Sequence, residues 1–169
     1  MGNLPRRGRI TGVLFASALT ALCVWAPPAS AEQRYWSADP RDSQGRYPSN
    51  WHCDTSAYLD ACLINSHNGT QPVYRSVMIV KNNTNAGIQL SAAVINMWAV
   101  TGSSKQVRDD GCHNSGLSSW YAAACYGSPA TLSAVCSAAP GATHVTANAA
   151  VNIDGWRDSE ASYPVPVNC

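Results

Sequence analysis

The 169-residue sequence has little charge, a single phenylalanine and none of the commonest hydrolase motifs. Charged residues make up 12% of the chain, and its 11 lysines and arginines almost balance its 10 acidic residues. A protein that binds nucleic acid usually carries a basic surplus, so nucleic acid is not an expected partner. Neither G-x-S-x-G nor H-E-x-x-H occurs, which removes the usual signatures of α/β-hydrolases and of zinc proteases.

The sequence also lacks an apolar run long enough to cross a membrane, which needs about 20 residues. The apolar run at residues 10–26 follows three arginines and ends at two prolines. Small residues at 29–31 then match the signal-peptidase rule. These features predict that residues 1–31 are a secretory signal peptide. The mature chain, residues 32–169, is then expected to be secreted, without a membrane anchor, and to form one domain.

The mature chain holds six cysteines, and an even number in an exported domain predicts three disulfides and no free thiol. Six cysteines allow about 15 pairings. Sequential pairing keeps two loops short and ties down the last residue of the chain. We therefore expect the pairs Cys53–Cys62, Cys112–Cys125 and Cys136–Cys169.

Apolar and β-branched runs predict several strands. Residues 73–82 and 88–100 are separated by an Asn-rich stretch with a glycine, which favours a hairpin. In the second run, alternate residues predict one buried face: Ile88, Leu90, Ala92, Val94, Trp98 and Val100. Residues 143–153 alternate as well, with Val145, Ala147, Ala149, Val151 and Ile153 on one side. Asp154-Gly155 then predicts a tight turn into a final strand.

The stretch at 115–141 can be interpreted in two ways. Its alanines favour helix, whereas its short segments between glycines and prolines favour two strands, the interpretation we prefer. Six short strands predict an all-β fold, a small antiparallel β-sandwich stapled by disulfides. The alternative is an α+β fold with one short helix near 118–126. The core is expected to be small because residues 32–169 are rich in alanine and contain no phenylalanine.

The segment RYWSADPRDSQGRYPSNWHC, residues 34–53, contains no Val, Ile, Leu or Met. It is rich in Trp, Tyr and Arg, the residue types that dominate binding hot spots. We therefore predict an N-terminal arm at residues 32–52, ahead of a β-sandwich domain at 53–169. The predicted partner-binding residues are Arg34, Tyr35, Trp36, Arg41, Arg46, Tyr47 and Trp51. Equally, the segment could fold back over its own sandwich, with Trp36 and Trp51 covering the core.

No catalytic residue, metal ligand or cofactor is predicted. The histidines, His52, His67, His113 and His144, lie in no recognisable catalytic motif. Asp109-Asp110, followed by a glycine, indicates a solvated turn. Cys112, next to a histidine, is expected to form a disulfide rather than act as a thiol catalyst. The stretch at 152–160 lacks the dense acidic start of a calcium loop.

Three non-enzymatic functions fit these features. The preferred one is an adaptor or accessory subunit that binds another secreted protein through the arm. A protease inhibitor would instead present a rigid loop, between Cys53 and Cys62 or between Cys112 and Cys125. A carbohydrate-binding module would stack sugar rings on exposed aromatic residues, for which the candidates are Trp120, Tyr121, Tyr126 and Trp156.

In size, in its predicted export and in the aromatic segment ahead of Cys53, the sequence resembles the small adaptor proteins of the umbrella-shaped antibacterial toxin particles of actinobacteria. That resemblance implies a compact exported β-domain with an N-terminal extension, which links a lectin-like subunit to a larger scaffold. It also implies a role in competition between bacteria.

Overall fold

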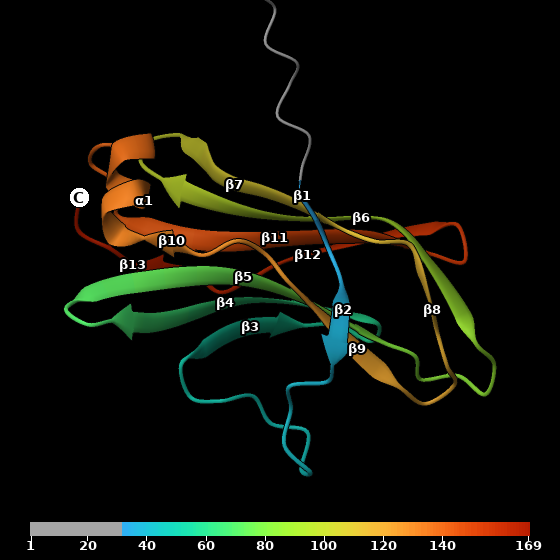
Figure 1. The fold of residues 1–169 in the computed structure, drawn as a ribbon. Coiled ribbons are helices and arrows are strands. Elements are labelled where there is room, and N and C mark those ends of the chain that lie inside the picture. The colour runs from blue at the N-terminus through green and yellow to red at the C-terminus, as the bar shows by residue number, and fades with distance from the viewer. Residues whose placement is uncertain (1–31) are drawn as a thin grey trace, which may run out of the picture. The chain divides into compact units, whose positions relative to one another are not determined.

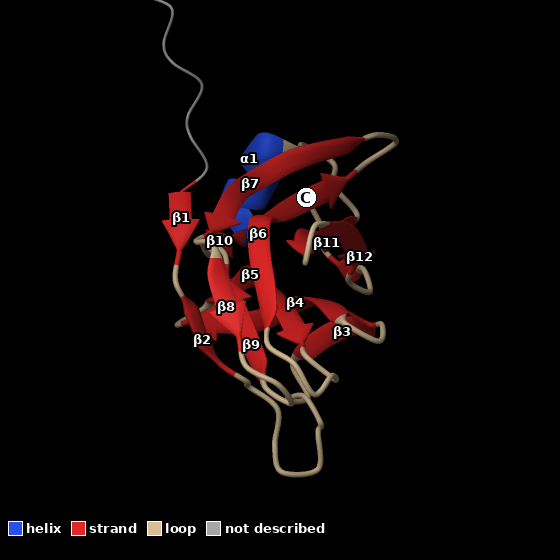
Figure 2. Ribbon diagram, turned by 90° about the vertical axis from the view of Figure 1, so that its right-hand side faces the viewer, coloured by secondary structure: helices blue, strands red, loops and turns tan. Residues whose placement is uncertain are grey.

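The computed structural model describes residues 32–169, and the predicted signal peptide at 1–31 lies outside the described residues. Two β-sheets pack face to face in this range (Figures 1 and 2). The first sheet has the order β1 (Glu32–Arg34), β7 (Ser104–Cys112), β6 (Ile88–Val100), β11 (His144–Ile153) and β12 (Trp156–Ala161), with β8 (Ser115–Leu117) paired to β6 and β13 (Val165–Pro166) paired to β11. Between residues 32 and 169, no helix has the length and apolar character that a membrane span requires.

The second sheet has the order β2 (Trp36–Ala38), β9 (Ala122–Tyr126), β5 (Gln71–Lys81), β4 (Leu59–Asn68) and β3 (Trp51–Thr55), with β10 (Ala130–Thr131) paired to β5. β1 runs parallel to β7, and the other strand pairs are antiparallel. The predicted disulfide-stapled, all-β sandwich is therefore confirmed.

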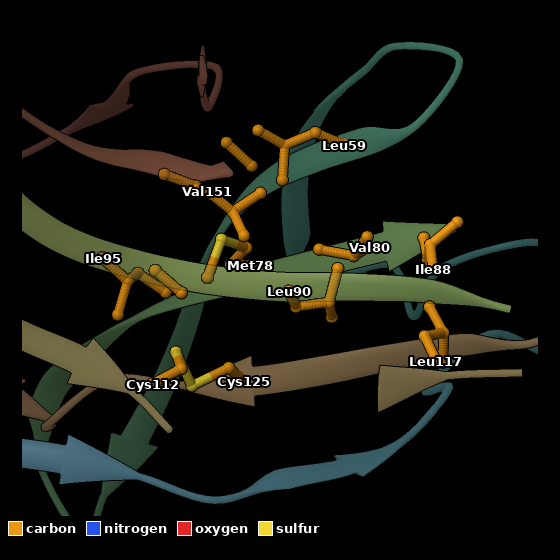
Figure 3. Close-up of a cluster of buried hydrophobic side chains, with 13 residues drawn as sticks. Leu59, Met78, Val80, Ile88, Leu90, Ile95, Cys112, Leu117, Cys125 and Val151 are labelled. Atoms are coloured by element: carbon orange, nitrogen blue, oxygen red, sulfur yellow. A yellow bond between two sulfur atoms is a disulfide. The ribbon is translucent and has the colours of Figure 1, made fainter. Parts of the chain in front are cut away.

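The three disulfides have the predicted pairing: Cys53–Cys62, Cys112–Cys125 and Cys136–Cys169. The second one joins β7 to β9 and therefore crosses the space between the sheets. It is buried among core side chains of both sheets, including Met78 and Leu90 (Figure 3). Disulfides of this number are typical of an oxidising, extracellular-type environment.

The alternative interpretation, a helix near 118–126, is wrong, and the preferred strands are present in the 115–141 stretch as β8 and β9. Residues 118–121 form a turn, closed by the amide of Tyr121 donating to the carbonyl of Ser118, and β9 follows. One short helix, α1 (Leu132–Ala138), is described further along the same stretch. It begins there because the Thr131 hydroxyl accepts a hydrogen bond from the amide of Ala134, which is the standard N-cap contact.

The predicted hairpin between residues 73–82 and 88–100 is also wrong, because β5 and β6 belong to different sheets. β5 instead forms a hairpin with β4, in which Asn68 pairs with Gln71 across a two-residue connection. Gly69 supplies the positive φ of 63° that such a turn requires. No strand was predicted at residues 59–68, where β4 lies. By contrast, the predicted hairpin at Asp154-Gly155 is confirmed by the pairing of β11 with β12.

A backbone irregularity in β6 reverses which side chains face the core. Ile88 and Leu90 are buried as predicted, but Ala92 has a φ of 49° and the pairing with β11 shifts register near this point. Beyond it the buried residues are Ala93, Ile95, Met97 and Ala99. A one-residue offset moves every later side chain to the other face, so the predicted inward position of Val94, Trp98 and Val100 is wrong.

Candidate functional site

The N-terminal segment joins one edge of the first sheet to the same edge of the second. β1 pairs with β7 in the first sheet, and β2 pairs with β9 in the second. Tyr35 is the one residue between these two strands. Figure 2 shows β1 above β2 at one side of the sandwich. Residues 32–38 therefore contribute backbone to both layers.

Arg34 ties β1 to a buried carboxylate. The Asp110 side chain accepts hydrogen bonds from Arg34 Nε at 3.3 Å, from the Ser128 amide at 2.8 Å and from the Ser128 hydroxyl at 2.7 Å. Asp110 is only 1% exposed. The predicted solvated turn at Asp109-Asp110 is therefore wrong, because both residues lie in β7. A buried charge requires a partner, and Arg34 supplies the opposite charge.

Trp36 and Tyr35 point in opposite directions. The Trp36 side chain packs against the core, and its indole Nε1 donates to the carbonyl of His113 at 2.7 Å. The Tyr35 side chain is 79% exposed, although its ring lies 4.5 Å from the ring of His113. Tyr35 is thus a largely exposed aromatic residue on a backbone that is held on both sides.

The rest of the segment covers the outer face of the second sheet. The rings of Tyr47 and Trp51 stack at 5.7 Å, and the Trp51 ring meets the edge of Tyr126 at 6.0 Å. Beneath these rings lies a buried apolar cluster of Cys62, Val77, Ile79 and Ala124. This cover explains why β4 and β5 carry apolar residues on both faces rather than alternating.

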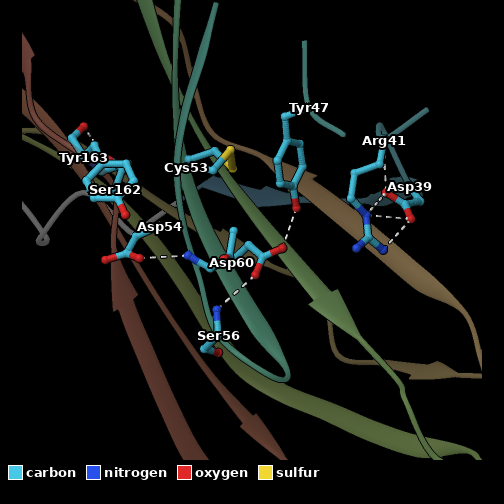
Figure 4. The surroundings of a disulfide bond; sticks show 12 residues. Asp39, Arg41, Tyr47, Cys53, Asp54, Ser56, Asp60, Ser162 and Tyr163 are labelled. Atoms are coloured by element: carbon cyan, nitrogen blue, oxygen red, sulfur yellow. Dashed lines mark hydrogen bonds and ion pairs between the residues drawn. A yellow bond between two sulfur atoms is a disulfide. The ribbon is translucent and has the colours of Figure 1, made fainter. Parts of the chain in front are cut away.

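A polar cluster fixes this cover at its edge (Figure 4). The Tyr47 hydroxyl donates to one oxygen of the buried Asp60 carboxylate at 2.5 Å, and Lys81 Nζ donates to the other at 2.5 Å. Burial raises the pKa of the Tyr47 hydroxyl, and the hydrogen bond to Asp60 raises it further. Tyr47 is therefore held as a neutral hydrogen-bond donor inside the protein's own structure.

Arg41 and Arg46 form local ion pairs. Arg41 Nη2 lies 2.7 Å from an Asp39 oxygen. Burial raises the pKa of Asp39, but the hydrogen bonds and the charge of Arg41 lower it by more, so the pKa lies below its usual value. Arg46 pairs with Asp42 at 2.9 Å on the surface. Of the seven predicted partner-binding residues, Tyr35 and Arg46 are exposed and the other five are partly buried against the chain itself. This folded-back arrangement is one of the two alternatives that the sequence left open.

A shallow hollow of about 500 Å³ opens beside Tyr35. We call it the N-terminal surface, and it is lined by Glu32, Gln33, Arg34, Tyr35, Ser37, Arg75 and Tyr126. The guanidinium of Arg75 lies 5.1 Å from the centre of the Tyr126 ring, and its Nε donates to the carbonyl of Gly127. Arg75 was not predicted from the sequence, because it lies in β5 and reaches this surface only through the pairing of β5 with β9.

Two further observations bear on function. Across residues 32–169, no three His, Cys, Asp or Glu side chains are grouped so that they could hold a metal ion. No protein-family model matches the chain, and no curated protein matches its sequence.

Proposed function

We propose that the protein is a secreted, non-enzymatic adaptor or accessory subunit whose N-terminal surface binds another secreted protein. The proposal rests mainly on the exposure of Tyr35. This tyrosine is 79% exposed and lies between two short strands that belong to different sheets. An aromatic side chain left in water on an ordered backbone has a large contact area available to a partner.

An ordered backbone favours binding energetically. A free arm would lose about 1–2 kcal/mol of conformational entropy for each residue that a partner fixed. Residues 32–38 are already fixed by β1, by β2 and by the Arg34–Asp110 ion pair. A partner that binds Tyr35 would therefore not have to order this segment, and preorganisation of this kind raises affinity.

The chemistry of the surface indicates what the partner presents. Tyr35 offers an exposed ring for apolar side chains, and Arg75 lies over the partly buried ring of Tyr126. Tyrosine and arginine together are typical of the centre of a protein interface. We expect the partner to present an apolar side chain to Tyr35 and carbonyl or carboxylate oxygens to Arg75.

The proposal predicts that Tyr35→Ala weakens partner binding by about tenfold or more, because hot-spot residues contribute about 2 kcal/mol or more. The mature protein, tagged at its C-terminus, would be used to capture partners from the producing organism's culture supernatant. Captured proteins would be identified by mass spectrometry, and their affinity for the variant would be measured. The unfolding free energy should change by less than about 0.5 kcal/mol, as for most surface substitutions.

Tyr163→Ala is the matched control, because Tyr163 is also exposed but lies outside the N-terminal surface. It should leave capture unchanged. If Tyr35→Ala retained full affinity for every specifically captured protein, the proposed surface would be wrong. Stoichiometric inhibition of a protease by the mature protein, unchanged in Tyr35→Ala, would favour the inhibitor alternative instead.

A further inference from the structure

Exposed aromatic side chains lie on three turns at one end of the sandwich. Six large apolar side chains are exposed among the described residues, and four of them belong to this end: Tyr58, Trp120, Tyr121 and Trp156. Tyr58 lies between β3 and β4, Trp120 and Tyr121 lie between β8 and β9, and Trp156 begins β12. These connections lie toward the right-hand end of the sandwich in Figure 1.

Backbone hydrogen bonds hold these turns around the connection between β5 and β6. The amide of Lys81 donates to the carbonyl of Tyr58 at 2.8 Å, and the amide of Asn82 donates to the carbonyl of Tyr121 at 2.8 Å. On the other sheet, the amide of Asp154 donates a hydrogen bond to the carbonyl of Gln89 at 2.9 Å. The aromatic residues therefore have a fixed arrangement in the free protein.

A cleft of about 480 Å³ lies at this end, between an aromatic residue of each sheet. Tyr58, from the second sheet, and Trp156, from the first, are both exposed at the cleft, by 47% and 83% respectively. Ile88 and Ile153 also line it, so that the interior is apolar. Its volume falls in the range of about 300–1,000 Å³ that is typical of small-ligand sites.

The cleft is preformed because Asn82 holds its wall. Asn82 is buried, and its side-chain amide donates to the carbonyls of Ala86, Leu117 and Ser118 at 2.7, 3.1 and 2.9 Å. These contacts join the β5–β6 connection to the turn that carries Trp120. A ligand would meet a cleft that does not have to be built on binding.

Carboxylate oxygens in the cleft are available as hydrogen-bond acceptors. Asp154 accepts from the Gln89 amide at 2.7 Å through Oδ1, and Asp158 accepts from the Ser159 amide at 2.9 Å through Oδ1. In each, Oδ2 has no hydrogen-bond partner among residues 32–169. Free carboxylate oxygens suit a ligand that carries many hydroxyl donors.

Trp120 adds an observation of a different kind. Its φ of 63° lies in the left-handed region, which a bulky residue rarely adopts and which costs about 1–3 kcal/mol. The side chain is 70% exposed, so burial in the protein's own core does not offset that cost. Backbone strain of this kind is concentrated at functional sites.

From these features we infer that the cleft, together with the exposed rings of Trp120 and Tyr121 on the neighbouring turn, binds a neutral oligosaccharide. Sugar rings have apolar C–H faces that pack on indole and phenol rings, and their hydroxyls would donate to Asp154 and Asp158. Arg157 also lines the cleft, and its Nη1 donates to the Ala92 carbonyl. With two carboxylates and one guanidinium, the lining keeps a net negative charge, which disfavours an anionic sugar. A protein partner would need a contact area of about 800 Å² on this side, whereas the cleft has the size of a small-ligand site. This site is separate from the N-terminal surface.

The test measures binding of the mature protein to soluble neutral oligosaccharides of glucose, N-acetylglucosamine, mannose and galactose, followed by tryptophan fluorescence and calorimetry. We expect at least one to bind with a Kd below about 1 mM. Trp156→Ala and Tyr58→Ala should each weaken that binding by about tenfold or more, and Asp158→Asn should weaken it while keeping side-chain size. Trp156 and Tyr58 are exposed, and Asp158→Asn removes a charge from a partly buried position without changing its size, so the fold should persist.

Tyr35→Ala is the matched control and should bind the oligosaccharide as the wild type does, because Tyr35 belongs to the other surface. Failure of this inference and failure of the proposed function are therefore distinguishable. The inference is overturned if no oligosaccharide of the panel binds, or if Trp156→Ala binds as tightly as the wild type. If no sugar binds and Trp156→Ala abolishes capture of a protein, the inference is also overturned. This end of the sandwich would then be a protein interface.

Discussion

Replacing Asp110 by alanine is expected to lower the free energy of unfolding by about 3–5 kcal/mol, as removal of one partner from a buried ion pair does. Asp110 is 1% exposed and accepts hydrogen bonds from Arg34 and from both the amide and the hydroxyl of Ser128. The variant would leave these donors without their acceptor, and an unsatisfied buried donor costs free energy of desolvation. Urea unfolding of the mature protein, followed by circular dichroism, measures the effect.

Asp109→Ala is the control for this experiment, since Asp109 is the exposed neighbour on the same strand. It should change the free energy of unfolding by less than about 1 kcal/mol. A small domain has a total stability of about 5–15 kcal/mol, so Asp110→Ala should be visibly less stable even at room temperature. Equal effects of the two substitutions would show that the Arg34–Asp110 pair does not hold the N-terminal segment.

The second large effect is expected from Cys112→Ala combined with Cys125→Ala. This disulfide joins the two sheets, and both cysteines are buried in the core. Removing a native disulfide from a small secreted domain costs about 2–5 kcal/mol, and the lost sulfur atoms also leave unfilled core volume. We expect a loss in the upper part of that range, measured by urea unfolding under non-reducing conditions.

The comparison is the double substitution of Cys53 and Cys62 by alanine. These residues face each other in the β3–β4 hairpin, where strand pairing already holds them together, and Cys53 is only partly buried. We expect this variant to lose less stability than the Cys112/Cys125 variant. The reverse order would mean that the hairpin, rather than the contact between the sheets, depends most on a crosslink.

The sequence predicted the features that depend on local chemistry. Sequential pairing, which closes two short loops and ties down the last residue, predicted all three disulfides, and Asp154-Gly155 was sufficient to place one hairpin. The alternation at 143–153 also predicted the buried face of β11, from Val145 to Val151. In each case, a few neighbouring residues contain the information that decides the structure.

The features that failed depend on contacts between distant residues. Asp110 looked like part of a turn because its partner, Arg34, lies 76 residues away in the sequence. β4 and β5 have apolar residues on both faces because residues 39–51 cover the outer face of their sheet, and this contact is not visible in the local sequence. The face change at Ala92 has no signal in the sequence, because alanine seldom adopts a positive φ.

The candidate sites were predicted in part. The aromatic composition drew attention to Tyr35 and Trp156, which are exposed, and equally to Trp36 and Trp51, which pack against their own domain. Composition cannot separate these two groups because the same rings suit a core and an interface. Tyr58 was missed, since a single tyrosine in a turn carries no pattern and gains its meaning only from the cleft shared with Trp156.

The central claim is that residues 32–38 are a fixed part of both sheets and hold Tyr35 in place for a partner. Amide hydrogen exchange of the mature protein, read by mass spectrometry on a peptide covering Glu32–Ala38, tests it most directly. We predict that the hydrogen-bonded amides of this segment exchange at least about 100-fold more slowly than in an unstructured peptide. Exchange of the whole segment at the rate of an unstructured peptide would contradict the account and would make the N-terminal segment a free arm.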